Sequence, residues 1–178
     1  MAEPAEIGAD VIDRARQEAD HYRGDDPRPL GGYVVTMSAY LVVVAVSAVV
    51  AALTGRKLPE RWPIQDLVTI SLGTHKLSRT ITKESVTSPI RAPFTRYAGT
   101  GGPSEVIEET RNTSQIRHSL GELLTCPFCL DVWVATGFTI GLIFAPRFTR
   151  LVAGTFTALT GADFLQLAYA VAQQSAEG

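Results

Sequence analysis

The sequence contains little cysteine, little net charge and no recognisable cleavable signal peptide. Its two cysteines cannot form the framework of a disulfide-rich secreted protein. The formal net charge is only −2 and no basic face dominates, which argues against a nucleic-acid-binding protein, so no nucleic-acid partner is predicted. The first 32 residues carry charges of both signs, and the apolar run that follows begins too late and extends too far for a signal peptide.

The apolar residues are concentrated in a few long segments. Charged residues make up 19% of the chain, compared with roughly 25% in soluble proteins, and many of them lie in two polar stretches, 1–32 and 83–125. Residues 33–53 form 21 consecutive uncharged positions. A helix of this length spans about 30 Å, the thickness of the hydrocarbon core of a bilayer. We therefore predict a transmembrane anchor helix over 33–53, with Trp62 at the membrane interface. The alternative is a buried helix of a soluble protein.

Residues 63–82 have the pattern of an amphipathic helix. Pro63 suits the first turn of a helix, and four apolar residues fall on roughly one face: Leu67, Ile70, Leu77 and Ile81. Three basic residues make a full crossing of the bilayer costly unless their side chains reach the interface: His75, Lys76 and Arg79. The segment is therefore predicted to enter the bilayer as a short helix or to lie at its surface, and a full crossing stays open.

Two apolar segments in the C-terminal third, 129–145 and 151–172, predict a membrane hairpin. Residues 146–150 form a tight polar turn between them in this prediction, and 173–178 form a polar tail. Helices joined by so short a turn are antiparallel neighbours. Small residues spaced by four occur on both helices: Gly137, Gly141 and Ala145, and then Gly154, Ala158 and Ala162. This spacing allows close packing in lipid, within the hairpin or, as the less favoured alternative, in a homodimer.

Together these segments predict an all-α, multi-pass helical membrane protein with three or four membrane helices and a polar segment at 83–125. Residues 1–32 are expected to be a polar tail, either a short helix ending near Tyr22 or a disordered stretch, with a linker at 25–32. Within 83–125, Ser104 is expected to cap a helix whose first turns carry acidic residues: Glu105, Glu108 and Glu109. A stripe of apolar residues then leads to the cysteines: Ile116, Leu120, Leu123 and Leu124.

The distribution of the sixteen Lys and Arg residues predicts which parts of the chain face the cytoplasm. With four spans, eleven of these cations lie on the side of 83–125 and five on the other side; with three spans the division is ten to six. Because cytoplasmic segments are enriched in Lys and Arg, 83–125 is predicted to be cytoplasmic in both cases. The same rule places Cys126 and Cys129 on the cytoplasmic side and leaves the side of the N-terminus open.

Cys126-Pro127-Phe128-Cys129 is the most specific local motif. Two cysteines at this spacing support thiol–disulfide exchange when one thiolate is stabilised at a helix N-terminus. The Pro-Phe pair resembles the Pro-Tyr of glutaredoxins, but no strand–helix–strand pattern precedes it, so a thioredoxin fold is not predicted. Zinc prefers four ligands; His118 and His75 are weak candidates, and a dimer would supply a second cysteine pair. A structural turn with two reduced thiols is favoured over either role, so no cofactor is predicted, with zinc or iron as alternatives.

Asp163 is the other candidate for a functional residue. A carboxylate inside an apolar helix costs about 2.5–3.5 kcal/mol on insertion scales and by default suggests function. Folding the hairpin about residue 148 brings Asp163 level with Trp133, so Asp163 can accept a hydrogen bond from the indole or pair with a basic residue of 75–79. Structural pairing is favoured over proton or ion handling. We therefore hypothesise a single polar intramembrane cluster made of Cys126, Cys129, Asp131, Asp163 and one or more of His75, Lys76 and Arg79.

Two strings of residues are distinctive. The first is His75-Lys76-Leu77-Ser78-Arg79 followed by Ser88-Pro89-Ile90-Arg91-Ala92-Pro93-Phe94, and the second runs from Gly121 to Cys129 and continues to Trp133. Over about 64–170 the chain resembles an uncharacterised bacterial membrane family, domain of unknown function 1360. Asp131 departs from the small residue expected there. The resemblance implies a membrane location and supplies no established activity.

Three functions stay open from the sequence. The leading hypothesis is an interaction or structural component of the bacterial cell envelope, with 83–125 available for partner contact. The second is a membrane thiol-redox or metal-binding protein that uses Cys126 and Cys129, and the third is a small transporter that depends on Asp163. The expected partners are the lipid bilayer and either further copies of the chain or another membrane protein. An enzymatic activity is not favoured.

Overall fold

The computed structural model describes residues 4–24 and 28–177, most of which are helical. Its elements in chain order are α1 (Pro4–Arg23), α2 (Leu30–Leu53), α3 (Ile64–Lys83), the 3-10 turn η1 (Ser85–Thr87), α4 (Ser88–Arg91), β1 (Thr95–Thr100), β2 (Val106–Thr110), α5 (Gln115–Thr125), α6 (Pro127–Phe144) and α7 (Pro146–Glu177). Three of the described helices, α2, α6 and α7, are long and apolar enough to cross a membrane. The mostly helical class is therefore confirmed, with the exception of the two strands.

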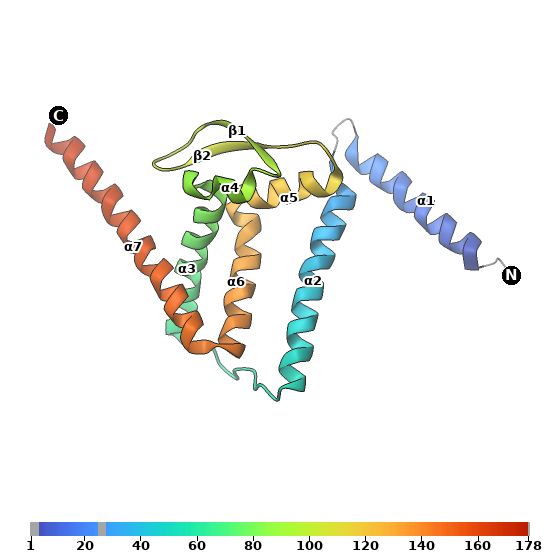
Figure 1. Ribbon diagram of the computed structural model, residues 1–178, viewed down its shortest axis with the longest axis horizontal. Coiled ribbons are helices and arrows are strands. Elements are labelled where there is room, and N and C mark those ends of the chain that lie inside the picture. Colours follow the sequence, from blue (N-terminus) through green and yellow to red (C-terminus); the bar gives the residue numbers. More distant parts are fainter. Residues whose placement is uncertain (1–3, 25–27, 178) are drawn as a thin grey trace.

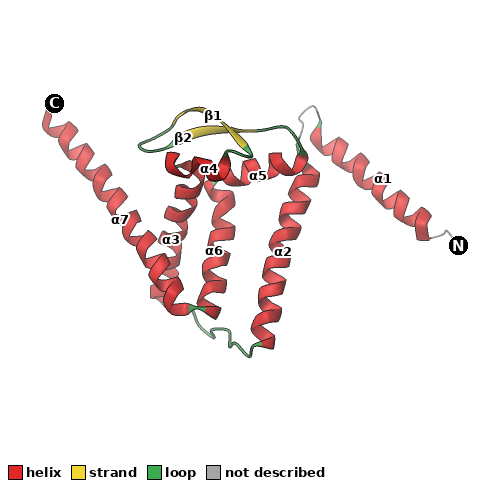
Figure 2. Cartoon of the chain, in the orientation of Figure 1, coloured by secondary structure: helices red, strands yellow, loops and turns green. Residues whose placement is uncertain are grey.

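Figure 1 shows α2, α3 and α6 standing side by side, while α7 leans away from them. One end of these helices is covered by α4, the two strands and α5, and we call this part of the chain the cap (residues 84–125). The loop between α2 and α3 and the junction of α6 and α7 lie at the opposite end. α1 projects outward from the cap end (Figure 2). The chain thus runs along the bundle four times, in α2, α3, α6 and α7.

α3 packs against both α6 and α7, although it is the least apolar of these four helices. Most of its buried residues are small or polar: Asp66, Gly73, Thr74, Ser78 and Thr82. Hydroxyl groups of α7 bind its backbone. Thr157 Oγ1 donates to the carbonyl of Thr69 at 2.8 Å, and Thr160 Oγ1 donates to the carbonyl of Leu72 at 2.9 Å. The amphipathic segment expected at 63–82 is therefore a helix that runs beside α6.

A close crossing of small residues joins α3 to α7. A Cβ added at Gly73 would lie 2.9 Å from the carbonyl oxygen of Ala153, which is itself buried. Of the glycines in the expected hairpin stripe, Gly141 faces a side chain of α7, whereas an added Cβ at Gly137 or Gly154 would meet nothing within 4 Å. The sequence therefore pointed to close helix packing but did not identify α3 as the helix that α7 approaches.

The junction between α6 and α7 is shorter than expected. Because α6 ends at Phe144 and α7 begins at Pro146, the polar turn expected at 146–150 is wrong, and these residues form the first turns of a helix. Proline fits this position because the first backbone N–H groups of a helix have no intrahelical acceptor. At its other end α7 continues to Glu177, so the expected polar tail at 173–178 is helical as far as it is described.

The prediction of an all-α fold is wrong in the cap. β1 and β2 pair antiparallel, with a bulge between Tyr97 and Gly99. Ser104, the expected helix cap, lies in the turn between the strands with a φ of 64°. The acidic residues that suggested a helical first turn pair with other elements instead. Glu109 pairs across the hairpin with Arg96 at 2.6 Å, whereas Glu105 pairs with α3 and Glu108 with α4. Strand pairing and these charge pairs outweigh the local preference of acids for a helix start.

The N-terminal tail is helical over Pro4–Arg23, which is one of the two alternatives that the sequence left open. Its ion pairs are local and exposed, for example Arg14 with Asp10 at 3.2 Å. α2 begins at Leu30, inside the expected linker at 25–32, so the last part of that linker is helical. Residues 25–27 of the linker lie outside the described residues.

Candidate functional site

Arg91 is fully buried between α3 and the cap. Its Nη1 donates to the carbonyl of Ile81 at 2.5 Å, and its Nη2 donates to the carbonyl of Glu84 at 3.0 Å. These carbonyls lie at the end of α3, where backbone acceptors have no partner within the helix. Thr87 Oγ1 donates in the same way to the carbonyl of Thr80 at 2.5 Å. The cap therefore supplies the hydrogen bonds that close the C-terminus of α3.

Glu108 of β2 completes this buried site. Arg91 Nε and Nη2 donate to its two carboxylate oxygens at 2.7 and 3.1 Å, and Thr95 Oγ1 donates to one of them at 3.1 Å. Burial by itself raises the pKa of a carboxyl group. The hydrogen bonds from Arg91 and from neighbouring hydroxyls outweigh this effect, so the pKa of Glu108 lies below its usual value. The pair is therefore ionised at neutral pH and fixes the hairpin to α3.

Lys76 of α3 binds two carboxylates from different parts of the chain. Its Nζ lies 2.6 Å from Glu84 Oε1 and 2.9 Å from Asp163 Oδ2. Glu84 also accepts a hydrogen bond from Thr80 Oγ1 at 2.9 Å. The Lys76 side chain is 15% exposed and that of Asp163 is 48% exposed. Asp163 is thus paired with one of the basic residues considered for it, and this contact links α7 to α3 near the cap.

Asp131 and Arg79 make separate contacts on other sides of α3. Asp131 of α6 accepts a hydrogen bond from Ser78 Oγ, and Arg79 pairs with Glu105 in the cap. His75 is exposed. Asp131, Asp163 and the basic residues Lys76 and Arg79 of the expected cluster are therefore divided among three contacts, which connect α3 to α6, to α7 and to the cap. Cys126, Cys129 and His75 take part in none of these contacts.

The two cysteines lie at the start of α6. Cys126 is the N-cap residue, and the backbone N–H of Cys129 donates to its Sγ at 3.2 Å. Both thiols are free, and Cys129 is exposed. His118, a weak metal candidate, lies 3.4 Å from Glu122. Within residues 4–24 and 28–177, no group of three or more His, Cys, Asp and Glu side chains is arranged to hold a metal ion. A metal held by the two thiols would need further ligands from another chain.

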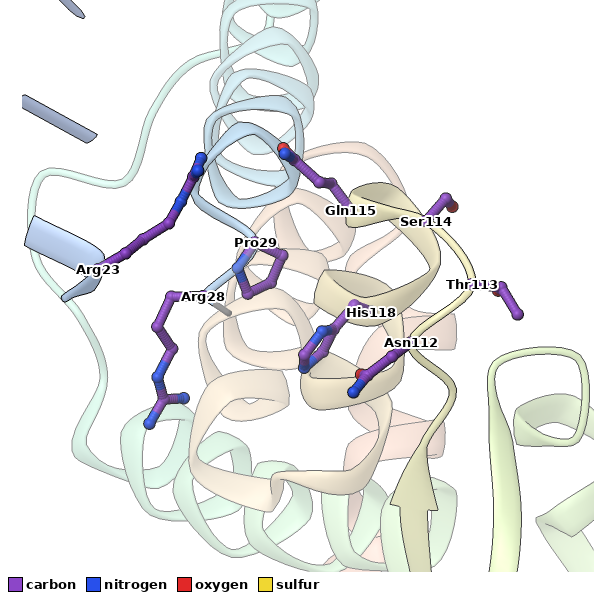
Figure 3. Close-up of a pocket in the computed structure, with 8 residues that line it drawn as sticks. All are labelled: Arg23, Arg28, Pro29, Asn112, Thr113, Ser114, Gln115 and His118. Atoms are coloured by element: carbon purple, nitrogen blue, oxygen red, sulfur yellow. The ribbon is translucent and has the colours of Figure 1, made fainter. Parts of the chain in front are cut away.

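Glu122 of α5 connects the cap to the start of α2. It accepts a hydrogen bond from Tyr33 Oη, and Arg28 Nη1 lies 3.5 Å from Glu122 Oε1. A Cβ added at Gly32 would overlap the carbonyl oxygen of Gln115, so α2 and α5 meet backbone to backbone. Beside this junction is a cavity of about 250 Å³, lined by the end of α1, the residues before α2 and the segment that leads into α5 (Figure 3). α2 is thereby attached to the cap.

Residues 69–169 match the family described as "Protein of unknown function (DUF1360)". The match covers more than half of the chain and agrees with the resemblance noted over about 64–170. The chain belongs to the DUF1360 family. The DUF1360 region contains most of α3, the whole cap, α6 and most of α7, whereas α1 and α2 lie outside it. No curated protein and no solved structure matches the chain.

Several residues that hold the DUF1360 region together were not among the candidates from the sequence: Ser78, Glu84, Arg91, Glu105 and Glu108. Glu122, which joins this region to the start of α2, was not among them either. Arg91 lies within the first string that carried the resemblance, and this was the available signal for it. Glu108 gave no such signal, because its partner lies 17 residues away and on a different element. The charges of this site are largely paired with one another, so the site is built as a rigid support for the cap.

Proposed function

We propose that the protein is an integral membrane protein that holds the cap at the membrane surface for contact with another protein. α2 supports the membrane placement, because its large apolar side chains are exposed along its whole length: Val34, Val35, Met37, Leu41, Val42, Val43, Val44, Val46, Val49, Val50 and Leu53. Soluble monomers rarely expose an apolar surface of this extent, whereas lipid is a favourable environment for it.

The buried Arg91–Glu108 pair is the observation that carries the proposed contact role. It fixes the hairpin and α4 to the end of α3. Several large apolar side chains of the cap are more than half exposed: Val86, Ile90, Tyr97 and Ile107. Fixed apolar and aromatic side chains are typical anchors of protein–protein contacts. The partner would be another membrane protein or a second copy of the chain.

The cap is proposed to lie on the cytoplasmic side of the bacterial cell membrane, because Lys and Arg are more numerous on its side of the apolar helices. Alkaline carbonate washing of membranes and labelling of single cysteines test this placement. In a Cys126→Ser, Cys129→Ser background, we expect a cysteine at Tyr97 to react only after the membrane is opened, and one at Leu58 to react in intact cells. The opposite pattern would place the cap outside.

Photo-crosslinking tests the contact itself. A photoreactive amino acid at Tyr97 or Ile107 should give one discrete protein adduct in intact membranes. The same photoreactive amino acid in place of Gln17, which is exposed on α1, serves as the control for random collisions. Identical adducts from all three positions, or none from the cap, would contradict the contact role.

Thiol exchange at Cys126 and Cys129 is the second candidate function. It is favoured by the position of Cys126 at a helix N-terminus and by the exposure of Cys129. A redox-active pair would give a disulfide that forms and breaks reversibly under a thiol buffer, as seen by alkylation of the free thiols. Stoichiometric zinc or iron that is lost in Cys126→Ser would instead indicate a metal site. A transporter role for Asp163 has less support, because its carboxylate is paired with Lys76.

A further inference from the structure

A second cavity lies at the end of the bundle opposite the cap. Its volume is about 430 Å³, and it is formed by the loop between α2 and α3, the first turn of α3, the last turns of α6 and the first turn of α7. Figure 1 shows these elements converging at that end. The cavity lies beyond Leu53, where the apolar α2 ends, and beside the last turns of α6, which ends at Phe144. In the membrane placement proposed above, this is the level of the lipid headgroups.

Three cationic side chains and one carboxylate line this cavity: Lys57, Arg61, Arg150 and Asp66. Asp66 is 9% exposed at its side chain, and both of its oxygens are already bound by Arg150, with Nε–Oδ1 and Nη2–Oδ2 distances of 2.8 Å. Glu60, the acid of the loop between α2 and α3, does not line the cavity. The cavity is therefore positively charged, and its single acid is fully used by one of the cations.

The Asp66 pair also orients the guanidinium of Arg150. Arginine carries five N–H donors in a planar fork, and Asp66 takes donors on Nε and Nη2, so Nη1 has no protein partner within residues 4–24 and 28–177. Lys57 and Arg61 make no ion pair with any residue in the same described ranges. Lys57, Arg61 and Arg150 therefore line one cavity, and the Lys57 and Arg61 charges and Nη1 of Arg150 have no protein acceptor within residues 4–24 and 28–177.

Apart from Thr139, the remaining wall of the cavity is apolar and aromatic. Leu142 and Ile143 of α6 line it on one side, and Trp62 and Leu58 line it on the side of the loop. Trp is common at the level where hydrocarbon gives way to water. A fully soluble anion would use only the cationic part of such a site, whereas a ligand with a phosphate and an acyl chain would use both parts.

We propose that this cavity binds the headgroup of an anionic phospholipid. The phosphate is held by Lys57, Arg61 and the free Nη1 of Arg150, since oriented guanidinium and ammonium groups are the usual partners of phosphate oxygens. The first carbons of an acyl chain lie along Leu142 and Ile143. The inference rests on the proposed membrane placement and is independent of any partner at the cap.

Lipid binding to the purified full-length chain tests this site. Delipidated protein in detergent is titrated with phosphatidylglycerol and, separately, with phosphatidylcholine of the same acyl chains, and bound lipid is counted by native mass spectrometry. The phosphatidylglycerol is expected to bind more tightly. The double variant Lys57→Gln, Arg61→Gln is expected to lower its affinity by about thirtyfold, since each cation near anionic lipid contributes about fivefold.

Two control variants isolate the cavity from general charge and folding effects. Arg14→Gln, Arg16→Gln removes the same charge from exposed positions of α1 and is expected to leave the affinity unchanged. Lys57→Arg, Arg61→Lys keeps the charge and is expected to retain the preference for phosphatidylglycerol. If the glutamine variant binds phosphatidylglycerol as well as the wild type does, or if the wild type binds both lipids equally, the proposal is overturned.

A third titration separates a lipid from a free anion. Inorganic phosphate at millimolar concentration is expected to leave phosphatidylglycerol bound, because it lacks the acyl chain that contacts Leu142 and Ile143. Full displacement by phosphate would show a site for the free ion and would overturn the lipid assignment. A chain that resists carbonate washing but shows no lipid preference would contradict this inference alone, whereas a chain released by carbonate would contradict the membrane placement itself.

Discussion

In a soluble protein an apolar helix lies in the interior and a polar helix at the surface, and α2 and α3 show the opposite arrangement. α2 is almost entirely apolar, yet it lies at the edge of the bundle with only Gly32 and Ala51 buried. α3 carries charged and hydroxyl residues along its length, yet it packs against both α6 and α7. In water this arrangement would be unfavourable. It is the arrangement expected in lipid, where apolar side chains face outward and polar groups must be satisfied by other helices.

This comparison explains why α3 was difficult to place from its sequence. Its charged residues count against a membrane helix when each is considered alone. In the fold they have partners, as Asp66 has Arg150 and Lys76 has Asp163. α3 should therefore be sensitive to substitutions that remove its partners, whereas α2 should tolerate substitutions on its exposed face.

The largest effect is expected from Arg91→Leu, which removes the residue that closes the C-terminus of α3. Glu108 would be left as a buried carboxylate without its cationic partner, and the carbonyls of Ile81 and Glu84 would each lose a donor. Loss of one partner from a buried pair costs about 3–5 kcal/mol. Thermal or chemical unfolding in detergent measures the loss. The matched control is Arg96→Leu, whose pair with Glu109 is exposed and is expected to cost about 0–1 kcal/mol. Equal losses in the two variants would refute the capping role of Arg91.

The next effect is expected from Gly73→Ala, at the crossing of α3 and α7. The added Cβ would lie 2.9 Å from a backbone oxygen of Ala153, so the helices must separate. Overpacking of this kind costs about 1–3 kcal/mol. Gly137→Ala on α6 is the control, because its Cβ meets nothing within 4 Å, and alanine gains up to about 1 kcal/mol in helix propensity. The difference in unfolding free energy between the two variants therefore measures the cost of separating α3 and α7 at this crossing. No difference would show that the two helices do not meet there.

A smaller loss of folding stability is expected at acidic pH. The pKa of Glu108 is lower in the folded chain than its ordinary value of 4.5, so the folded state binds its proton less readily than the unfolded state does. The resulting stabilisation is fully present above about pH 4.5 and is lost as the pH falls through the lower folded pKa. Stability measured against pH should therefore decline in this acidic range, and Glu108→Gln should decline less. Parallel curves for the two proteins would show that Glu108 is not the group responsible.

The smallest effect is expected at α2. Tyr40 Oη and Thr136 Oγ1 are 2.9 Å apart, and the Tyr40 ring meets Trp133 edge to face with centroids 5.3 Å apart. Tyr40→Phe keeps the ring and removes one hydrogen bond between helices, which is worth about 0.6 kcal/mol on average in a membrane protein. Unfolding in detergent should show a loss of this size. A loss as large as that of Arg91→Leu would mean that α2 is as dependent on polar contacts as α3 is.

The membrane-length helices were the most accessible part of the fold from sequence. Length and local hydrophobicity predicted α2 almost completely, and they predicted α6 and most of α7. The position of Cys126 and Cys129 at the start of a helix was also readable, since Pro127 suits a first turn. In the cap, by contrast, the acids of β2 were assigned to a helix. Their partners, Arg91 and Arg96, lie on other elements, and local charge patterns do not reveal such pairing.

The sequence by itself determined that this chain has long apolar helices suited to a membrane, because that property depends on consecutive residues and on nothing distant. The tertiary structure decided which helix lies in the middle, how α7 approaches it and where each charge finds its partner. These outcomes depend on groups far apart in the chain, such as Lys76 with Asp163 and Arg150 with Asp66. A charged residue in an apolar context is costly until its partner is known, and the fold supplies that partner.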